Sequence, residues 1–326
     1  MRIGMIGAGW IAANHAARIA RTPGVELAAV CDLDAERARG LADGRPVYTD
    51  WHEMLEREAP DAVFVCTPPL THREPALAAL ERGIHLYLEK PIARGLDDAR
   101  AIVAAAERAT AVCAVGYQWR GIDVLDTLRE ALAGQEVGLV IGSGTGPTES
   151  RPWFLNRAQG GGNLLERASH IIDLERAVAG EVVAVQAAAS SVPLAQSADR
   201  ERGDIEDAAV LLLRFEGGGV GSVQIAWTRD EMPSHYSLDV LANDASLRLE
   251  LDPTFALSGR SRGASVEAAM RGHPMDLTFE RFLAAARAGD RGAVFCTPAQ
   301  AAGTLAVALA CEEAIATGAT VRVAAP

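Results

Sequence analysis

The 326-residue sequence has few of the features that mark secreted, membrane or metal-binding proteins. Its cysteines number five, which is odd, and none of them forms a C-x-x-C pair. Three lie in apolar runs such as DAVFVCT, where a buried, reduced thiol is the expected state. No run approaches the roughly 18 apolar residues of a membrane span, and the first residues, MRIGMIGAGW, lack the apolar core and cleavage site of a signal peptide. These absences predict a cytoplasmic protein without a membrane partner.

Basic side chains are also outnumbered by acidic ones. The sequence has 31 Lys and Arg residues against 43 Asp and Glu residues, for a net charge of −12. Such a surface repels nucleic acids and anionic membranes, so we expect neither as a partner and favour small-molecule chemistry. Hydrophobic residues make up 49%, as in ordinary globular proteins, and the chain is long for a single layered core. Two domains are therefore expected.

Short apolar runs alternate with helical patterns from residue 1 to about residue 117. The runs have the length and the Val, Ile and Leu content of strands. They are RIGMIG, VELAAVCD, RPVY, DAVFVCT, IHLYLE and AVCAVGY. Parallel strands must be joined by crossovers, and the helical patterns between the runs supply them. We therefore predict an N-terminal α/β domain, residues 1–118, with a doubly wound parallel sheet of the Rossmann type.

The rhythm changes after about residue 118. A helix, DVLDTLREALAG, and a strand, VGLVIGSG, precede the segment GGGNLLERASHIID. Longer strands follow, which we expect to pair as an open, mostly antiparallel sheet. They are VVAVQAAASS, DAAVLLLRFE, VGSVQIAWT, YSLDVLAND and SLRLELD. With two more helices near 276–288 and 298–317, residues 119–326 predict an α+β domain whose last helix is free to pack back on the first domain.

The first strand runs into GAGWIA, which matches the dinucleotide-binding pattern G-x-G-x-x-A. The string alone is weak, but here it follows a strand and opens a helix. Gly7 permits the tight turn, Gly9 lets the backbone approach a pyrophosphate, and Ala12 lets helix pack on strand. The first N–H groups of the helix, at Trp10 and Ile11, then face the phosphates.

A carboxylate, Asp32, ends the second strand 23 residues after Gly9. In that position it accepts hydrogen bonds from both ribose hydroxyls and repels a 2′-phosphate, and the next residues, Leu33 and Asp34, supply no Arg. NAD is therefore favoured over NADP as the cofactor. The alternative is that Asp32 only caps the helix that begins in DAERA.

The fifth strand ends in LYLEKPIA. A lysine at the carboxyl end of a parallel strand projects toward the place where doubly wound folds bind ligands. An exposed lysine is ordinarily a solvated charge, but Lys90 lies between Glu89 and Pro91 at a strand end, which is unusual for surface chemistry.

At this point the sequence resembles the Gfo/Idh/MocA oxidoreductases, a family that includes inositol dehydrogenases and glucose–fructose oxidoreductase. The resemblance covers nearly the whole chain. It rests on GAGWIA, TPPLTH, EKP, GYQWR and GGGNLLERASHIID. It implies an N-terminal NAD(P)-binding domain and a C-terminal domain whose sheet mediates oligomerisation, with the active site between them. A homodimer or homotetramer is therefore expected.

The resemblance also implies roles for individual residues. The lysine of EKP corresponds to Lys90, the catalytic histidine to His170, and the motif aspartate to Glu166. The cofactor-binding set extends to the loops after two strands. These further residues are Thr67, Pro68, His72, Glu89 and Lys90 itself.

Four positions depart from the family pattern. Glu166 replaces Asp with a side chain one methylene longer, which changes the position of the carboxylate, and Ala168 replaces the usual Gly. Pro69 and Gln118 each replace an Asn. The consequence of Glu166 for the choice of substrate is left open by the sequence.

Glu166 and His170 are four residues apart, and Asp173 follows three residues later, so a helix places all three on adjacent positions of one side. The segment has three interpretations. It is a solvated face, a metal site, or an acid/base pair. A metal site lacks an H-E-x-x-H motif or a second ligand cluster, so we predict no metal. As an acid/base, His170 takes the hydroxyl proton while hydride leaves the carbon, Glu166 orients the imidazole, and Lys90 donates to the developing alkoxide.

Polar and aromatic residues near this segment are candidates for contacts with a sugar ring and its hydroxyls. They are Arg120, Trp153, Asn156, Arg157 and Asp173. Trp153 is equally compatible with packing at a domain junction.

Together these features predict an NAD-dependent oxidoreductase that transfers hydride between NAD and a secondary hydroxyl or ketone of a sugar, cyclitol or sugar derivative. One alternative is an NAD-dependent glycoside hydrolase or lyase of the same fold. The other is a non-catalytic, sugar- or NAD-sensing regulatory protein.

Overall fold

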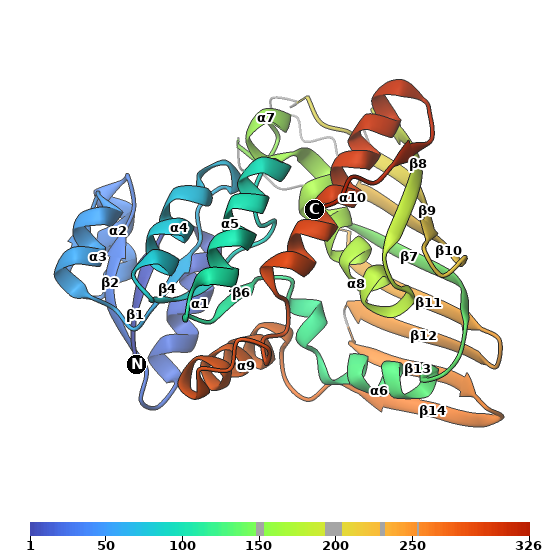
Figure 1. Cartoon of the computed structure of the whole chain (residues 1–326), viewed down its shortest axis with the longest axis horizontal. Helices are drawn as coiled ribbons and strands as arrows, with labels where there is room; N and C mark the ends of the chain where they lie inside the picture. The colour runs from blue at the N-terminus through green and yellow to red at the C-terminus, as the bar shows by residue number, and fades with distance from the viewer. Residues whose placement is uncertain (148–152, 193–203, 229–231, 253) are drawn as a thin grey trace. The chain divides into compact units, whose positions relative to one another are not determined.

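The computed structural model of the protein describes residues 1–147, 153–192, 204–228, 232–252 and 254–326. The chain divides into two compact units (Figure 1). The first consists of Met1–Gln118 and Met275–Ala302, and the second of Trp119–Pro274 and Gly303–Pro326. The sequence placed all of 119–326 in the second domain, whereas this division assigns most of helix α9 (Pro274–Ala288) to the first unit.

The first unit contains a six-stranded sheet in which every neighbouring pair is parallel. The strand order is β3-β2-β1-β4-β5-β6. The strands are β1 (Arg2–Ile6), β2 (Glu26–Cys31), β3 (Val47–Tyr48), β4 (Ala62–Val65), β5 (His85–Leu88) and β6 (Cys113–Val115). The order reverses between β1 and β4, which is where Rossmann folds bind dinucleotides beside the carboxyl ends of the strands. The predicted Rossmann sheet is confirmed.

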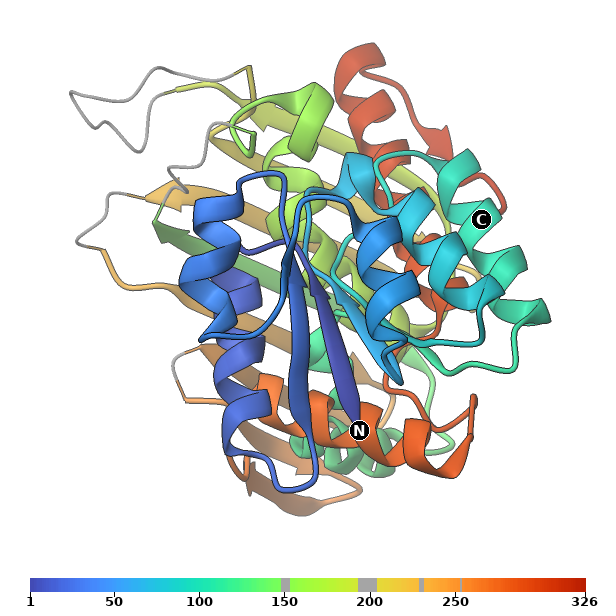
Figure 2. The ribbon, with the colours of Figure 1, turned by 90° about the vertical axis from the view of Figure 1, so that its left-hand side faces the viewer.

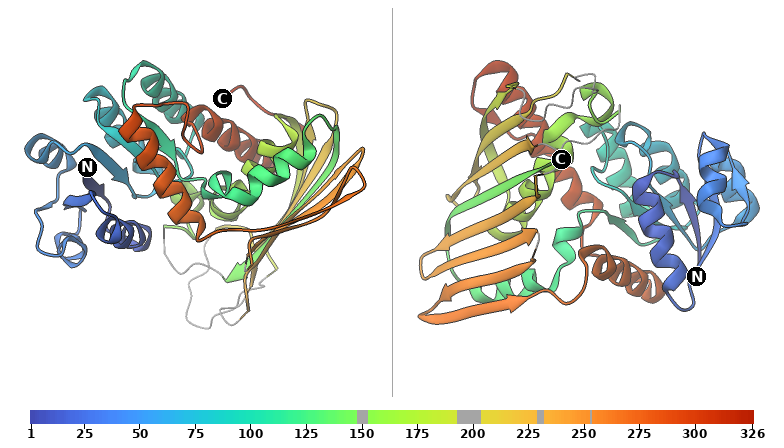
Figure 3. Two further views of the ribbon diagram at one scale, coloured as in Figure 1. Left: turned by 90° about the horizontal axis from the view of Figure 1, so that it is seen from below. Right: turned by 180° about the vertical axis from the view of Figure 1, so that it is seen from behind.

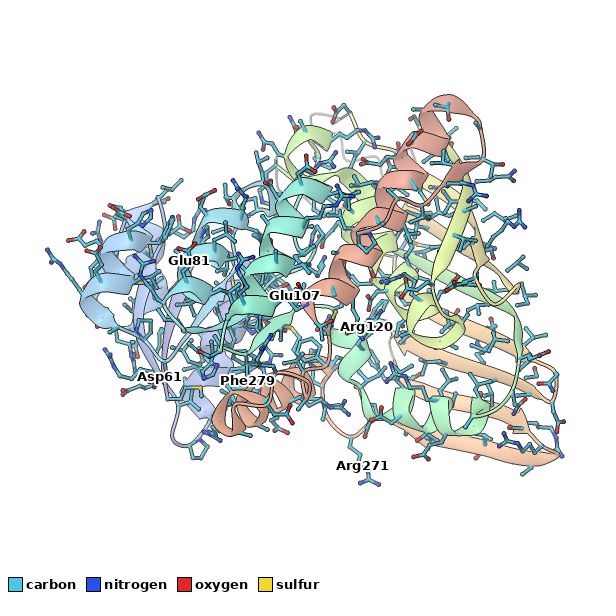
Figure 4. The ribbon with its side chains drawn as sticks, in the orientation of Figure 1. Asp61, Glu81, Glu107, Arg120, Arg271 and Phe279 are labelled. Atoms are coloured by element: carbon cyan, nitrogen blue, oxygen red, sulfur yellow. The ribbon has the colours of Figure 1, made fainter. Side chains whose placement is uncertain are left out.

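Helices cover both faces of this sheet, with α1 on one side and α4 and α5 on the other (Figure 2). The helices are α1 (Trp10–Arg21), α2 (Ala35–Ala42), α3 (Trp51–Glu58), α4 (Arg73–Glu81) and α5 (Leu96–Arg108). Helix α9 joins them through aromatic packing, because Phe279, labelled in Figure 4, and Phe282 meet Phe64 at ring distances of 5.8 and 5.4 Å. That packing explains why a segment so late in the chain belongs to the first unit.

The second unit is built on a nine-stranded sheet of order β14-β13-β12-β11-β7-β10-β9-β8-β15. Its strands are β7 (Val137–Pro147), β8 (Val182–Ser190), β9 (Ala208–Phe215), β10 (Val220–Thr228), β11 (His235–Ala242), β12 (Ala245–Asp252), β13 (Ala256–Ser261), β14 (Ala264–Ala269) and β15 (Val321–Arg322). Only β7 and β10 pair in parallel, so the predicted mostly antiparallel sheet is confirmed. The sequence analysis missed the β13–β14 hairpin, because its small and polar residues show little apolar alternation.

One face of the nine-stranded sheet carries α6 (Asp123–Leu132) and α8 (Ser169–Ala179), as Figure 3 shows. Among the described residues, no helix covers the opposite face. In β10, Val223, Ile225 and Trp227 are buried while the alternate residues are more exposed, as the two-residue strand period predicts.

Helix α10 (Pro298–Thr317) is long and apolar enough, by length and composition alone, to cross a membrane. However, 61% of its most apolar window is buried within the protein. Its buried Thr304 also donates a hydrogen bond to Asp173. We therefore describe α10 as a core helix.

Candidate active site

The glycine-rich loop between β1 and α1 has the two properties that a pyrophosphate site requires. Gly7 has a φ of 95°, and a Cβ there would lie 2.6 Å from the carbonyl oxygen of Cys66, so only glycine fits. A Cβ at Gly9 would meet nothing within 4 Å, which leaves open space above the loop. No side chain caps α1, and its first turn holds no acidic residue. Its N–H groups therefore suit an anionic ligand.

Asp32 holds the glycine-rich loop and its own turn together. Its Oδ2 accepts from the Ala8 N–H at 2.7 Å, and its Oδ1 accepts from the Asp34 N–H at 2.9 Å. The cap of α2 is Asp34, whose carboxylate accepts from the N–H groups of Glu36 and Arg37. The interpretation of Asp32 as the helix cap is therefore wrong. Since a carboxylate has about four acceptor positions and Asp32 is partly exposed, it can still accept from ribose hydroxyls.

The loop after β4 presents Thr67 and Pro68, which are both partly exposed. The Oγ1 atom of Thr67 is buried and has no hydrogen-bond partner among the described residues. His72 is fully buried, with Nε2 2.8 Å from the Thr67 carbonyl oxygen and Nδ1 3.0 Å from that of Pro91. Burial lowers the pKa of His72, against the opposing effect of these hydrogen bonds. His72 thus ties two site loops together from within.

Three apolar side chains at this edge of the sheet are exposed; the sequence analysis predicted Trp10 as a cofactor contact but missed Leu33 and Leu70. Trp10, Leu33 and Leu70 are 66%, 92% and 56% exposed. They are the large exposed apolar residues that the structure describes in the first unit, and they follow β1, β2 and β4. Exposed apolar groups at a strand edge suit the flat rings of a ligand. The sequence could have identified Leu33 and Leu70, because each comes shortly after a strand end that carries a predicted cofactor residue, Asp32 or Thr67.

Lys90 follows β5 and is partly exposed, whereas its neighbour Glu89 is 8% exposed. The two side chains therefore have different surroundings, although they are adjacent in sequence. Glu89 accepts from the backbone N–H of Lys90 at 3.2 Å and lies 2.9 Å from Nε2 of His15. Lys90 is also the only lysine in the sequence, in which every other basic residue of the 31 is arginine. The sequence analysis did not use this signal, although arginine cannot replace an amine that must release or move a proton.

In the second unit, Gly161 and Gly162 have φ values of 76° and 68°. A Cβ at Gly161 would lie 2.6 Å from the Leu165 side chain, and one at Gly162 would lie 2.8 Å from that of Ile205. Both glycines are therefore required by the chain itself. They serve the backbone conformation and close packing by the chain's own side chains.

The segment then continues through a π-helical turn, η3 (Leu164–Ala168), into α8. From residue 160 to residue 176, every side chain is buried except Glu166 and His170, which are partly exposed. The wide turn keeps residues four apart on one side of the helix. The His170 ring packs against Trp119, with ring centroids 4.9 Å apart, and Trp119 packs against Tyr236 at 5.1 Å. The sequence analysis did not identify these two aromatic neighbours.

Asp173 does not share the exposed stripe. It is 1% exposed, so the expectation that it extends the face of Glu166 and His170 is wrong. Arg120, which Figure 4 labels, is 5% exposed and donates from Nε to Asp173 Oδ2 at 2.6 Å. Thr304 of α10 donates to Asp173 Oδ1 at 2.7 Å. Both carboxylate oxygens therefore have protein partners.

Arg176, one turn after Asp173, extends this buried network. It donates from Nη1 to Thr304 at 2.6 Å and makes a two-point ion pair with Glu181. A Cβ at Gly303 would overlap its guanidinium. The network thus ties α8, which carries His170 and continues from the turn that carries Glu166, to α10.

Glu206 organises the start of the helix that carries the two exposed groups. This residue, 3% exposed, accepts from the Leu164 N–H at 3.0 Å and from Arg157 Nη2 at 2.6 Å. Asn156 caps the short α7 (Arg157–Gly160) by accepting from the Gln159 N–H. Two predicted substrate contacts therefore have structural partners.

Trp153 is half-buried and packs against a cluster of Phe154, Ile205 and Trp227. These contacts lie within the second unit, so they show that Trp153 packs there but do not test its predicted place at a domain junction. The side chain nevertheless keeps a solvent-exposed part that a ligand could cover.

Helix α8 approaches the sheet over glycines. Cβ atoms at Gly142 and Gly144 of β7 would overlap the side chain of Ile171, and at Gly144 the distance would be 2.9 Å. A Cβ at Gly221 of β10 would overlap the carboxyl group of Glu175. The glycine-rich segment GSGTG, residues 142–146, thus lies inside strand β7, where glycines without side chains make room for the helix.

Comparison with known proteins decides the family. Residues 1–117 match the model of an oxidoreductase family with an NAD-binding Rossmann fold, and residues 127–248 match the Gfo/Idh/MocA C-terminal domain. The chain is 30% identical to 1,5-anhydro-D-fructose reductase of Ensifer adhaerens, over 70% of this chain and 69% of the relative. The chain belongs to the Gfo/Idh/MocA family of oxidoreductases.

Other members of the Gfo/Idh/MocA family support this assignment. Myo-inositol 2-dehydrogenase of Thermotoga maritima is 30% identical over 68% of this chain and 67% of its own length. A solved structure of levoglucosan dehydrogenase in complex with NADH superposes with a TM-score of 0.86, at 21% identity and with complete coverage of both chains. At this identity the superposition shows the shared fold.

Proposed function

We propose that the protein is an NAD-dependent dehydrogenase or reductase that acts on a secondary hydroxyl or ketone of a sugar, cyclitol or sugar derivative. The observation that carries the proposal is the exposure of Glu166 and His170 alone within the otherwise buried stretch 160–176. Relatives named as 1,5-anhydro-D-fructose reductase, myo-inositol 2-dehydrogenase and D-glucoside 3-dehydrogenase support the substrate class.

The residues of the first unit fit a dinucleotide. The open space above Gly9 and the uncapped start of α1 suit the pyrophosphate. The unsatisfied Thr67 Oγ1 suits a polar group of the cofactor, and Asp32 suits the ribose hydroxyls of NAD rather than a 2′-phosphate. Leu33 and Leu70 offer apolar surface to its rings.

The bound nicotinamide would accept or return hydride. In the direction of oxidation, His170 takes the proton from the substrate hydroxyl, Glu166 orients the imidazole and stabilises its charge, and Lys90 donates to the oxygen as negative charge develops. In reduction, His170 returns that proton. General acid/base catalysis of this kind contributes about 10² to 10⁴ in rate.

Several predicted substrate contacts form hydrogen bonds within the protein, which suggests a structural role for them. We propose that Arg120 and Asp173 position α8, and that Asn156 positions α7. Trp153 and Arg157, which are partly exposed, remain proposed substrate contacts.

We also propose that the protein forms a cytoplasmic homodimer or homotetramer. The subunits would meet through the face of the nine-stranded sheet opposite α6 and α8. Exposed aliphatic residues on its strands support this interface. They are Val183, Val210, Leu212, Val220 and Leu241. Light scattering of the purified protein tests the assembly.

A panel of sugars, inositols and their ketones, assayed for NADH formation or consumption with NAD and NADP side by side, tests the activity. His170→Ala and Lys90→Ala should retain NADH binding and lose turnover by about 10² or more. As a control, His235→Ala replaces an exposed histidine of β11 and should retain turnover. Full activity in both site variants would contradict the proposal, and bond cleavage without net NADH would favour a hydrolase or lyase instead.

A further inference from the structure

His15 is a buried polar residue for which the proposed chemistry has no use. It lies on α1, is 0% exposed, and packs edge-on against Phe64 and Tyr87 at ring distances of 5.1 and 4.9 Å. Its Nε2 lies 2.9 Å from Oε1 of Glu89. Its Nδ1 has no hydrogen-bond partner among the described residues. A buried imidazole between aromatic rings is costly unless its polar atoms serve a purpose.

The contact with Glu89 decides which ring nitrogen of His15 acts as the donor. A carboxylate oxygen accepts hydrogen bonds, so Nε2 of His15 donates to Oε1 of Glu89. Glu89 therefore accepts from His15 through Oε1, while Oε2 accepts from the Lys90 N–H at 3.2 Å.

The strand next to β5 is shaped around the same carboxylate. A Cβ at Gly116, just after β6, would lie 2.9 Å from Glu89 Oε2. The Gly116 N–H donates to the Leu88 carbonyl at 2.8 Å, which holds the two strand ends together. Glu89 is thus enclosed by α1, by its own strand end and by Gly116.

We propose that His15 is a positioning residue that holds Glu89 and, through it, sets the direction of the Lys90 side chain. Because α1 begins at the glycine-rich loop, this chain of hydrogen bonds links the cofactor-binding helix to the backbone of the residue that carries the amine. The effect on turnover rests on the proposed function of Lys90, whereas the effect on the conformation of Lys90 does not.

The single lysine makes this link directly measurable. Reductive methylation with ¹³C-formaldehyde labels Lys90 and the N-terminal amine only, so Lys90 gives one assignable dimethylamine resonance in the full-length protein. His15→Met removes the donor with little change of volume, and His15→Gln retains an N–H donor at similar reach. Ile19→Ala, a buried apolar change one turn further along the same helix, is the control for lost packing.

His15→Met should shift the Lys90 resonance and lower kcat by about 10- to 100-fold, the effect of a misplacement of roughly 1 Å, with NADH affinity unchanged. His15→Gln should restore both the resonance and most of kcat. Ile19→Ala should lower Tm without moving either. The double variant His15→Met/Glu89→Gln should lose no more kcat than the worse single variant, because both changes break one link.

Two results would overturn the positioning role. The first is a Lys90 resonance in His15→Met that matches the unsubstituted protein. The second is a His15→Gln variant as impaired as His15→Met. Full turnover in Lys90→Ala would instead refute the catalytic role of Lys90, and the resonance would still report whether His15 controls the lysine.

Discussion

Replacing Asp173 by asparagine removes one charge from a buried ion pair while keeping the shape of the side chain. Asp173 is 1% exposed, and its partner Arg120 is 5% exposed at 2.6 Å. Removing one partner of such a pair leaves the other charge buried and uncompensated, which costs about 3 to 5 kcal/mol. We expect Asp173→Asn to fall at the lower end, because the amide oxygen still accepts one hydrogen bond.

The matched control is the same substitution in an exposed pair. Asp239 and Arg248 lie 2.8 Å apart, with side chains that are 31% and 55% exposed. Exposed pairs contribute about 0 to 1 kcal/mol, so Asp239→Asn should be nearly neutral. Urea unfolding, followed by tryptophan fluorescence, compares the free energies of unfolding of the two variants. Trp119 and Trp227 are suitable probes because they lie in the second unit, which contains both ion pairs.

The same experiment decides between a structural and a substrate-binding role for Asp173. A structural role predicts a lower unfolding midpoint with KM for the sugar little changed in the protein that remains folded. If Asp173→Asn were as stable as Asp239→Asn and mainly raised KM, the buried-pair argument would be refuted and the original prediction of a substrate contact restored.

Three further substitutions test the packing, the protonation and the cofactor loop. Gly144→Ala should destabilise the protein by about 1 to 3 kcal/mol, because the new Cβ would overlap the Tyr236 ring at 2.7 Å and the Ile171 side chain at 2.9 Å. Thermal denaturation measures this against Gly138→Ala, where the nearest atom would be 4.0 Å away. Burial raises the pKa of Glu175 well above its usual value, so the folded state keeps its proton at higher pH than the unfolded state. The stability that Glu175 contributes is therefore complete below the ordinary carboxyl pKa and is lost as the pH rises through the raised pKa. Because glutamine does not titrate, Tm of Glu175→Gln should fall less between acid and alkaline pH than Tm of the unsubstituted protein. An unchanged dependence of Tm on pH would contradict this expectation. Gly9→Ala should leave Tm unchanged and weaken the affinity for NADH by about tenfold, or ~1.4 kcal/mol. Fluorescence titration measures this affinity, and an unchanged value would place the pyrophosphate elsewhere.

Local patterns in the sequence were sufficient for most of the first unit. The alternation of apolar runs and helical segments predicts the Rossmann sheet, since each strand and helix follows from residues near one another in the chain. The same holds for the glycine-rich loop and for Glu166 and His170, whose four-residue spacing places them on one side of any helical turn. Sequence resemblance then supplied the proposed chemistry.

Pairing between distant residues was decided only by the tertiary structure. Asp173 looks like part of an exposed stripe until Arg120 and Thr304 bury it from positions 53 and 131 residues away. His15 is an unremarkable helical residue until β5 brings Glu89 beside it, 74 residues later. Periodicity indicates which side of an element is apolar, but burial and hydrogen-bond partners depend on which other elements pack there. In this protein, the sequence by itself therefore determined the fold and the exposed acid/base candidates, and the tertiary structure decided which charged groups became supports for them.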